Sequence, residues 1–160
     1  MASEFLITEF GAVPDSLQLQ TGAIQRAIDA AAAGGGGCVR IPRGTYVAGT
    51  LRLASHLTLK LDEGAVLMGS SDIGDYDVRY WGGGFIVCSD LDRVTIEGPG
   101  VIDGADCRNP KGEEGFRGPH CIAFANCTNI VVRNLTVRRS ANWAFNCMSC
   151  SDVRFERLAI

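Results

Sequence analysis

The 160-residue sequence predicts an all-β fold: a single-stranded parallel β-helix, which is a solenoid, with a short α-helix that caps its N-terminal end. Three observations predict this fold. One segment alone has the residue spacing of an amphipathic helix. The rest consists of short runs that alternate apolar and polar residues between Gly, Asn, Asp and Ser. The last of these runs also repeat one another at a fixed interval, which is typical of a solenoid.

The capping helix is expected over about residues 21–33. Thr21 can cap its start, and the run Gly34–Gly37 ends it. Its apolar residues recur three and four positions apart and form one face that must be buried: Ala23, Ile24, Ala27, Ile28 and Ala31. No second helix separates the strand-like runs, so an alternating βαβ fold is excluded.

The internal repeat lies in the second half of the sequence. The stretch "CIAFANCTNIVVRNLTV" aligns with "NWAFNCMSCSDVRFERLAI", so that Ile122 meets Phe145 and Val137 meets Ile160, 23 residues apart. The preceding "FIVCSDLDRVTIEGPGVIDG" aligns at a distance of 36, because "GADCRNPKGEEGFRGPH" adds residues at one place. A period in the low twenties with three short apolar runs describes one turn of a solenoid, and such turns bury their inner residues only by stacking.

The turns are expected over about residues 38–160, within a single domain of residues 1–160. The last eleven residues, Cys150–Ile160, alternate like the strand portion of one turn, and no Gly, Pro or polar cap follows them. An uncovered turn exposes unpaired backbone groups and apolar side chains. We therefore expect the domain to be truncated at this end: the natural chain continues past Ile160, or self-association or a second chain covers the open turn.

The composition limits the partners and the compartment. A net charge of −3 with 21% charged and 46% hydrophobic residues is globular and gives no support for nucleic-acid binding. No apolar run is long enough to span a membrane, so no membrane partner is expected. The absence of a signal peptide and an odd count of seven Cys favour a reduced, cytoplasmic setting for the sequence as written. The glycosylation triplets at Asn126 and Asn134 would fit a secreted or periplasmic protein whose signal was removed.

Several stretches, in order, resemble glycoside hydrolase family 28, the polygalacturonases. The segment from "ITEFGAVPDS" to "LKLDEGAVLMGSSD" is similar to the N-terminal part of that family, and "IEGPGVIDGAD" resembles its Gly-x-Gly-x-Ile-Asp-Gly turn. The stretch "RGPHCIAFANCTNIVVRNLTVRRSANWAF" resembles its Arg-Pro…Asn-Cys…Asn-Val…Ser-Pro-x-Trp segment. The resemblance covers nearly the whole chain and implies the right-handed β-helix of the pectin-lyase-like superfamily.

The resemblance implies the N-terminal part of a polysaccharide-degrading enzyme that hydrolyses pectin- or polygalacturonate-type uronic polymers with inversion. In such chemistry a carboxylic acid protonates the leaving oxygen, and carboxylates about 6.5–9.5 Å away activate a water. The family's Asn-Thr-Asp, Asp-Asp, Gly-His-Gly and Arg-x-Lys motifs are absent from this sequence. We therefore assign no catalytic residue, and these residues alone are expected to be inactive.

Two alternatives stay open beside the hydrolase. A polysaccharide lyase or epimerase on the same scaffold would need a Ca²⁺ cage or a basic catalytic residue further along the chain. A non-catalytic β-helix, such as a tailspike stalk or an adhesin, would bind glycans or assemble. The fold by itself does not choose among these functions.

Four residues are candidates for substrate binding. Asn142 and Trp143 open the first strand of the last turn, on the sheet where the resemblance places the family's acids one turn later. An exposed Trp can stack on a sugar ring and Asn can bond its hydroxyls, whereas the alternative is that Trp143 packs beneath the following turn. Arg117 and His120 flank the same sheet and could meet an acidic sugar, and a structural or surface role is the alternative for His120.

No metal and no cofactor is expected, and the expected ligand is an acidic polysaccharide or oligosaccharide. The acids Asp72, Asp75 and Asp77 do not fit the spacing of a Ca²⁺ loop. Asp103 follows a strand, where Asp bonds to nearby backbone N–H groups. The Cys-x-x-Cys at Cys147 lacks both a helix N-terminus for redox chemistry and a second Cys pair for zinc.

Overall fold

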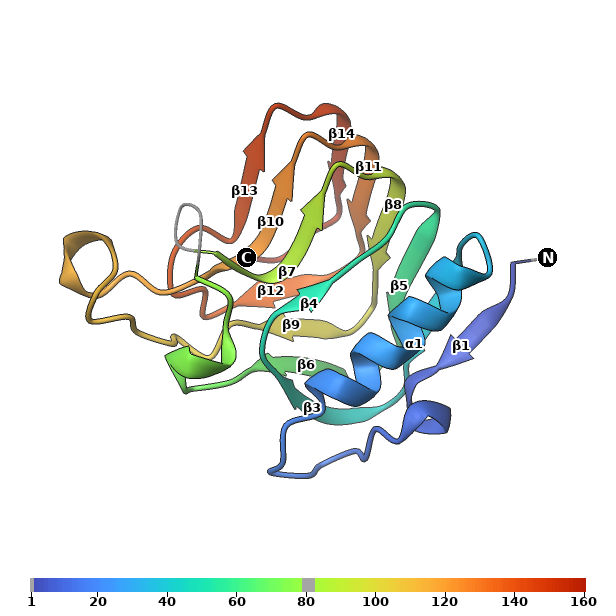
Figure 1. Cartoon of the computed structure of the whole chain (residues 1–160), viewed down its shortest axis with the longest axis horizontal. Helices are drawn as coiled ribbons and strands as arrows, with labels where there is room; N and C mark the ends of the chain where they lie inside the picture. Colours follow the sequence, from blue (N-terminus) through green and yellow to red (C-terminus); the bar gives the residue numbers. More distant parts are fainter. Residues whose placement is uncertain (1, 79–82) are drawn as a thin grey trace.

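The computed structural model describes residues 2–78 and 83–160, which form three parallel β-sheets wound around one core (Figure 1). Sheet A holds, in spatial order, β1 (Glu4–Leu6), β2 (Gly37–Ile41), β5 (Leu57–Leu61), β8 (Asp92–Glu97), β11 (Thr128–Arg133) and β14 (Ser151–Glu156). Sheet B holds β3 (Gly44–Ala48), β6 (Ala65–Gly69), β9 (Val101–Asp103) and β12 (Thr136–Arg138). Sheet C holds β4 (Leu51–Arg52), β7 (Gly84–Ser89), β10 (His120–Ala125) and β13 (Phe145–Met148).

The chain visits the sheets in the order B, C, A, so that each turn adds one strand to every sheet. Strands β3, β4 and β5 make one turn, and β6 to β8, β9 to β11 and β12 to β14 make the following ones. All pairings between these strands are parallel. The predicted fold class, an all-β right-handed parallel β-helix with one capping α-helix, is confirmed.

The strand register confirms the repeat that the sequence predicts. Ile122 in β10 pairs with Phe145 in β13, 23 residues later, and with Ile86 in β7, 36 residues earlier. At the far end of the last turn, Thr136 forms a parallel bridge with Ala159 at the same distance of 23. The extra residues therefore lie outside the ladder, in the connection 104–119 between β9 and β10.

The core is built from ladders of inward side chains. Leu59, Ile96 and Val132 occupy equivalent positions in β5, β8 and β11, and each is 0% exposed. Every second residue of a strand points inward, so the outer neighbours along the same strands face solvent. Full burial of each such side chain contributes about 1.5–3 kcal/mol, and this term exists only while the turns are stacked.

The helix α1 (Thr21–Ala33) covers the N-terminal end of the solenoid and contacts β1, β2 and β4 (Figure 1). The predicted apolar face is buried, and the Gly34 amide closes the helix by donating to Ala30 and Ala31. The predicted Thr21 cap is wrong: Gln20 is the N-cap and no side chain caps it. The Thr21 hydroxyl instead accepts a hydrogen bond of 2.8 Å from the Gly49 amide and so ties the helix to the first turn.

Two short 3-10 helices lie in the connections to sheet C, η2 (Ile73–Asp75) and η3 (Glu113–Gly115), and a third, η1 (Ile7–Phe10), lies near the N-terminus. In residues 2–78 and 83–160, no helix has both the length and the apolar character needed to cross a membrane.

Replacing Ile96 with Ala is expected to lower the free energy of unfolding by about 3 kcal/mol, because it leaves a cavity between the turns above and below. Thr95→Ala changes the outer face of the same strand and should cost less than about 1 kcal/mol. Urea denaturation followed by circular dichroism measures both variants. Equal losses for the two positions would contradict the assignment of the inner and outer faces.

Candidate functional site

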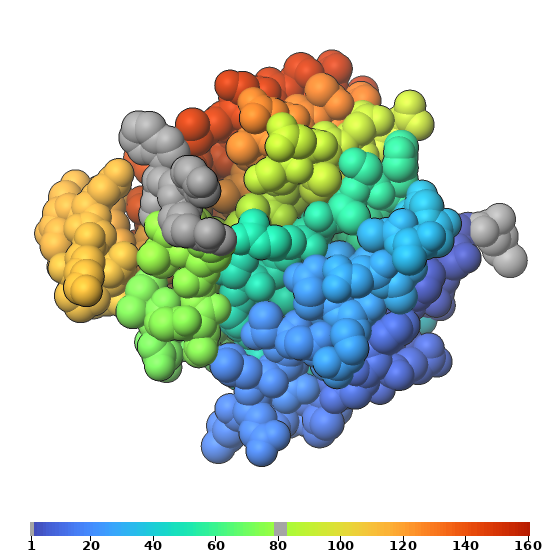
Figure 2. Space-filling model, viewed as in Figure 1, coloured from blue at the N-terminus to red at the C-terminus, as the bar shows by residue number. Residues whose placement is uncertain are grey.

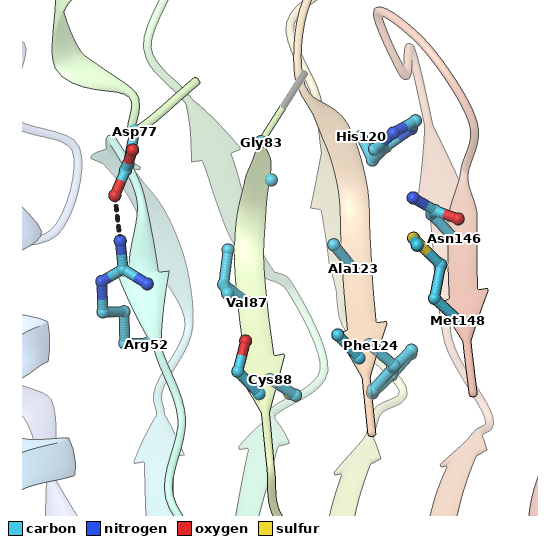
Figure 3. Close-up of a pocket in the computed structure, with 13 residues that line it drawn as sticks. Arg52, Asp77, Gly83, Val87, Cys88, His120, Ala123, Phe124, Asn146 and Met148 are labelled. Atoms are coloured by element: carbon cyan, nitrogen blue, oxygen red, sulfur yellow. Dashed lines mark hydrogen bonds and ion pairs between the residues drawn. The ribbon is translucent and has the colours of Figure 1, made fainter. Parts of the chain in front are cut away.

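The outer face of sheet C is hollowed into a groove with a volume of about 450 Å³. Parallel pairing aligns one outward residue from each of the four strands in a single row: Arg52, Val87, Ala123 and Asn146. A second row on the same face holds Ser89, Ala125 and Met148. The middle of the groove is therefore a floor of small and apolar side chains, with polar groups toward its two ends (Figure 3).

The groove follows directly from the alternation of residues in the strands. Ile86 and Ile122 are 0% exposed because they point into the core, so Val87 and Ala123, the next residues in their strands, point outward. The spacing between adjacent turns is about 4.8 Å, and the row of four residues thus spans about 14 Å along the solenoid axis.

Two long connections border the groove where the chain passes from sheet B to sheet C. One follows β6 and the other is residues 104–119, which follow β9. Figure 2 shows the segments at about residues 70–78 and 105–117 beside the same edge of the molecule. Thr50 holds the first connection: its hydroxyl donates to the Gly84 carbonyl and accepts from the Asp77 amide, both at 2.9 Å.

The second connection is fixed at its base by a buried carboxylate. Asp103 is 0% exposed; its Oδ2 accepts from Arg138 Nε at 2.7 Å and its Oδ1 accepts from Arg139 Nε at 2.8 Å. Its Oδ1 also accepts from the Ala105 amide at 2.9 Å, which is the turn contact that the sequence predicts. Burial alone would raise the pKa of Asp103, but the hydrogen bonds from Arg139, Ala105 and Arg138 outweigh it and lower the pKa.

The four candidate residues lie together at the end of the groove nearest the last turn. Arg117 donates to the Asn142 side-chain oxygen at 3.3 Å and to Glu114 at 3.1 Å, and Asn142 donates to the Gly118 carbonyl at 3.4 Å. The connection 104–119 is thereby joined to the segment that leads into β13. The hydrogen bond between Arg117 and Asn142 thus orients both side chains at the edge of the groove.

His120 and Trp143 are joined through the backbone. The Trp143 amide donates to His120 Nδ1 at 3.3 Å, and the Trp143 carbonyl accepts from the Ser140 hydroxyl at 2.8 Å. Because Nδ1 accepts, the neutral imidazole carries its proton on Nε2. His120 is 5% exposed, whereas the Trp143 side chain stands 63% exposed beside it. Both residues line a smaller hollow of about 220 Å³ together with Glu113, Asn146 and Met148.

Among the groove residues that sequence reasoning did not propose for binding are Arg52, Asp77 and Asn146. The repeat contains the signal for Asn146, since it lies 23 residues after Ala123 and pairs with it in the ladder. Arg52 and Asp77 form an ion pair across the connection after β6, outside the alignable repeats. No pattern in the sequence predicts that Arg52 and Asp77 lie in contact.

Two of the acidic residues that precede β7 accept hydrogen bonds from residues of the same connection. Asp72 Oδ1 accepts from the Gly74 amide at 2.8 Å and caps η2, and the carboxylate of Asp75 accepts from the Ser70 hydroxyl. Within the described part of the chain, no three His, Cys, Asp or Glu residues are grouped so that they could hold a metal ion.

The cysteines follow the register that the repeat predicts. Cys147 pairs with Phe124 at the distance of 23 residues, but it is exposed and does not lie in the core. All seven cysteines are free thiols. Burial raises the pKa of the Cys88 thiol well above its ordinary value and also raises that of Cys127. These thiols therefore stay protonated at neutral pH, and they pack as small apolar groups.

A parallel β-helix with a groove along one sheet belongs to the class of solenoid proteins. The chain belongs to the glycosyl hydrolases family 28, whose family model matches residues 36–160. The family resemblance that the sequence shows is thus confirmed.

The chain is also similar to individual proteins and to a solved structure. An exo-poly-alpha-D-galacturonosidase of Dickeya chrysanthemi is 44% identical over 75 residues, which cover 46% of this chain and 12% of that protein. The plasmin and fibronectin-binding protein A of Streptococcus pneumoniae is 31% identical over 148 residues, which cover 84% of this chain and 20% of that protein. The structure of a family 28 exopolygalacturonase of Yersinia enterocolitica superposes with a TM-score of 0.82 at 25% identity, covering 99% of this chain and 38% of that one. The chain thus spans well under half the length of these three relatives.

At pH 7, Asp103→Asn is expected to lower the free energy of unfolding by about 2 kcal/mol, because the neutral amide no longer attracts two half-exposed guanidinium groups. The pKa of Asp103 is lower in the folded than in the unfolded chain, so its contribution is present above the unfolded value. The contribution is lost as the pH falls through the folded pKa. The difference between wild type and variant should thus shrink below about pH 4.

Urea denaturation at several pH values measures this difference, and Asp106→Asn, at an exposed carboxylate three residues away, is the matched control. A difference between wild type and Asp103→Asn that stays constant down to about pH 2.5 would contradict the role of the charge.

Proposed function

We propose that the protein hydrolyses pectic or related uronic polysaccharides, and that the outer face of sheet C in this chain holds part of the polymer. The observation that carries the proposal is the groove itself, which runs across the four strands of sheet C. A linear glycan can follow the solenoid axis, because the turn spacing of about 4.8 Å is close to the length of one pyranose unit. Family membership supports the same reading.

The candidate residues have distinct roles in this proposal. The exposed indole of Trp143 is the platform on which a sugar ring stacks, and the Asn146 amide bonds its hydroxyls, while His120 positions the Trp143 backbone by accepting its amide. Asn142 and Arg117 hold the rim beside this platform, and Arg117 adds positive charge near an acidic chain. The ligand is an acidic polysaccharide or oligosaccharide.

The contribution of these 160 residues is binding and not bond cleavage. Inverting hydrolysis needs two carboxyl groups about 6.5–9.5 Å apart on either side of the bond. The two acids that line the hollows of sheet C lie apart from each other: Asp77 is paired with Arg52 beside the first strand, and Glu113 borders the last. The sequence contains none of the four catalytic motifs of the family.

The purified 160-residue chain is expected to bind oligogalacturonides without releasing reducing sugar from polygalacturonate. Isothermal titration calorimetry measures the binding, and a reducing-end assay measures turnover beside an active polygalacturonase as the positive control. Clear turnover by pure material would refute the assignment of a binding role alone, and the absence of any binding to uronic oligomers would refute the groove as a substrate site.

Trp143→Ala is expected to weaken the binding of a galacturonate hexamer about tenfold, because the sugar loses its aromatic platform. Trp143→Phe keeps a ring and should retain most of the affinity. Leu17→Ala removes another highly exposed apolar side chain, far along the sequence from the groove, and should leave binding unchanged. Titration of all three variants tests this, and equal affinities for wild type and Trp143→Ala would show that the indole does not touch the glycan.

A second candidate is an adhesive role, favoured by the 31% identity to the pneumococcal protein whose name records binding of plasmin and fibronectin. An adhesive chain would bind immobilised fibronectin or plasmin while ignoring oligogalacturonides. Surface plasmon resonance with both kinds of ligand separates the two candidates.

A further inference from the structure

Arg52 occupies the end of the groove opposite Trp143. It lies in β4, the edge strand of sheet C next to the capping helix, and its side chain is 53% exposed. In the outward row that continues through Val87 and Ala123 to Asn146, Arg52 is the only charged residue. The groove therefore has the ion pair of Arg52 with Asp77 at one end, and the exposed side chain of Trp143 lies beside the other.

The backbone of Arg52 is held by the capping helix. Gln25 in α1 accepts from the Arg52 amide through Oε1 and donates to the Arg52 carbonyl through Nε2, both at 3.0 Å. The side-chain amide thus replaces the neighbouring strand that an edge strand lacks. Because both backbone groups are satisfied, the position from which the side chain leaves the sheet is fixed.

The guanidinium of Arg52 is held by the connection after β6. One terminal nitrogen, Nη2, pairs with Oδ2 of Asp77, whose amide is bonded to Thr50. Figure 3 shows the other terminal nitrogen pointing along the sheet toward Val87, into the groove. A guanidinium has five N–H donors, so one carboxylate partner leaves donors for a second. Asp103 shows the converse arrangement in the same protein, because one carboxylate there binds two guanidinium groups.

We propose that Arg52 is a specificity-determining residue that binds the carboxylate of a uronic sugar at the end of the groove nearest the capping helix. This inference rests on the proposed function and adds to it a site for charge recognition. Arg52 is held in place before the ligand arrives, so little side-chain entropy is lost on binding. Its planar fork matches the two oxygens of a carboxylate.

The position of Arg52 makes the binding depend on the length of the ligand. The row from Arg52 to Asn146 spans three turn spacings, about 14 Å, which is room for about three sugar units. A dimer on Trp143 does not reach Arg52, whereas a tetramer or hexamer does. Charge recognition at Arg52 therefore acts on longer acidic chains alone.

The experiment compares Arg52→Gln with wild type by calorimetric titration of oligogalacturonides from dimer to hexamer and of a fully methyl-esterified hexamer. Arg52→Gln is expected to weaken hexamer binding about tenfold, with no change for the dimer or the esterified hexamer. Arg52→Lys keeps the charge without the fork and should lie between the two. Arg154→Gln makes the same charge change at an exposed position on sheet A and should bind like wild type.

The outcomes separate the two proposals. If wild type binds no uronic oligomer, the proposed function fails and this inference fails with it. If wild type binds the hexamer and folded Arg52→Gln, checked by circular dichroism, binds it equally well, Arg52 only ties the connection to β4 and the inference alone is overturned. Equal weakening of the dimer and the hexamer would also overturn it, because the effect would not come from the far end of the groove. Should Arg52→Gln fail to fold, Arg52→Lys decides: hexamer affinity equal to wild type would overturn carboxylate recognition by the fork.

Discussion

The whole structure depends on the stacking of one turn on the next. A single turn contributes one short strand to each sheet and can satisfy neither its backbone groups nor its inward side chains by itself. Leu59, Ile96 and Val132 are fully buried because each lies between equivalent residues of adjacent turns. At the N-terminal end, where no further turn lies beneath β4, the helix α1 takes over this task, and Gln25 bonds the edge strand as a neighbouring strand would.

The same stacking creates the groove. Strand residues alternate between the two faces, so the register that aligns Ile86 with Ile122 inside also aligns Val87 with Ala123 outside. Stacked rows of small side chains leave a shallow floor parallel to the solenoid axis, and both long connections rise at the same corner of the coil. The proposed function uses this shape to hold an extended polymer, and it is consistent with membership in the glycosyl hydrolases family 28.

Arginine side chains pair with an aspartate at two places near this surface, around Asp103 and at Arg52, and the two sites have different roles. Around Asp103 the carboxylate is buried and both guanidinium groups are committed to it, so the cluster fixes the connection 104–119. At Arg52 the guanidinium is half-exposed, it is held from behind by Asp77, and it faces the groove. The first arrangement stabilises the fold, and the second places a cation where an acidic chain would lie.

The sequence by itself determined the repeat, the register of Ile122 with Phe145, the capping helix and the place of the long insertion, because hydrophobic periodicity is local and recurs in each turn. It also marked the rim around Trp143 through the family resemblance. Only the tertiary structure decided that Thr21 bonds Gly49 instead of capping its helix, and that residues 25, 52 and 77 meet at one end of the groove. Those contacts depend on how a helix and an irregular connection pack against an edge strand, and side chains that meet this way follow no period in the sequence.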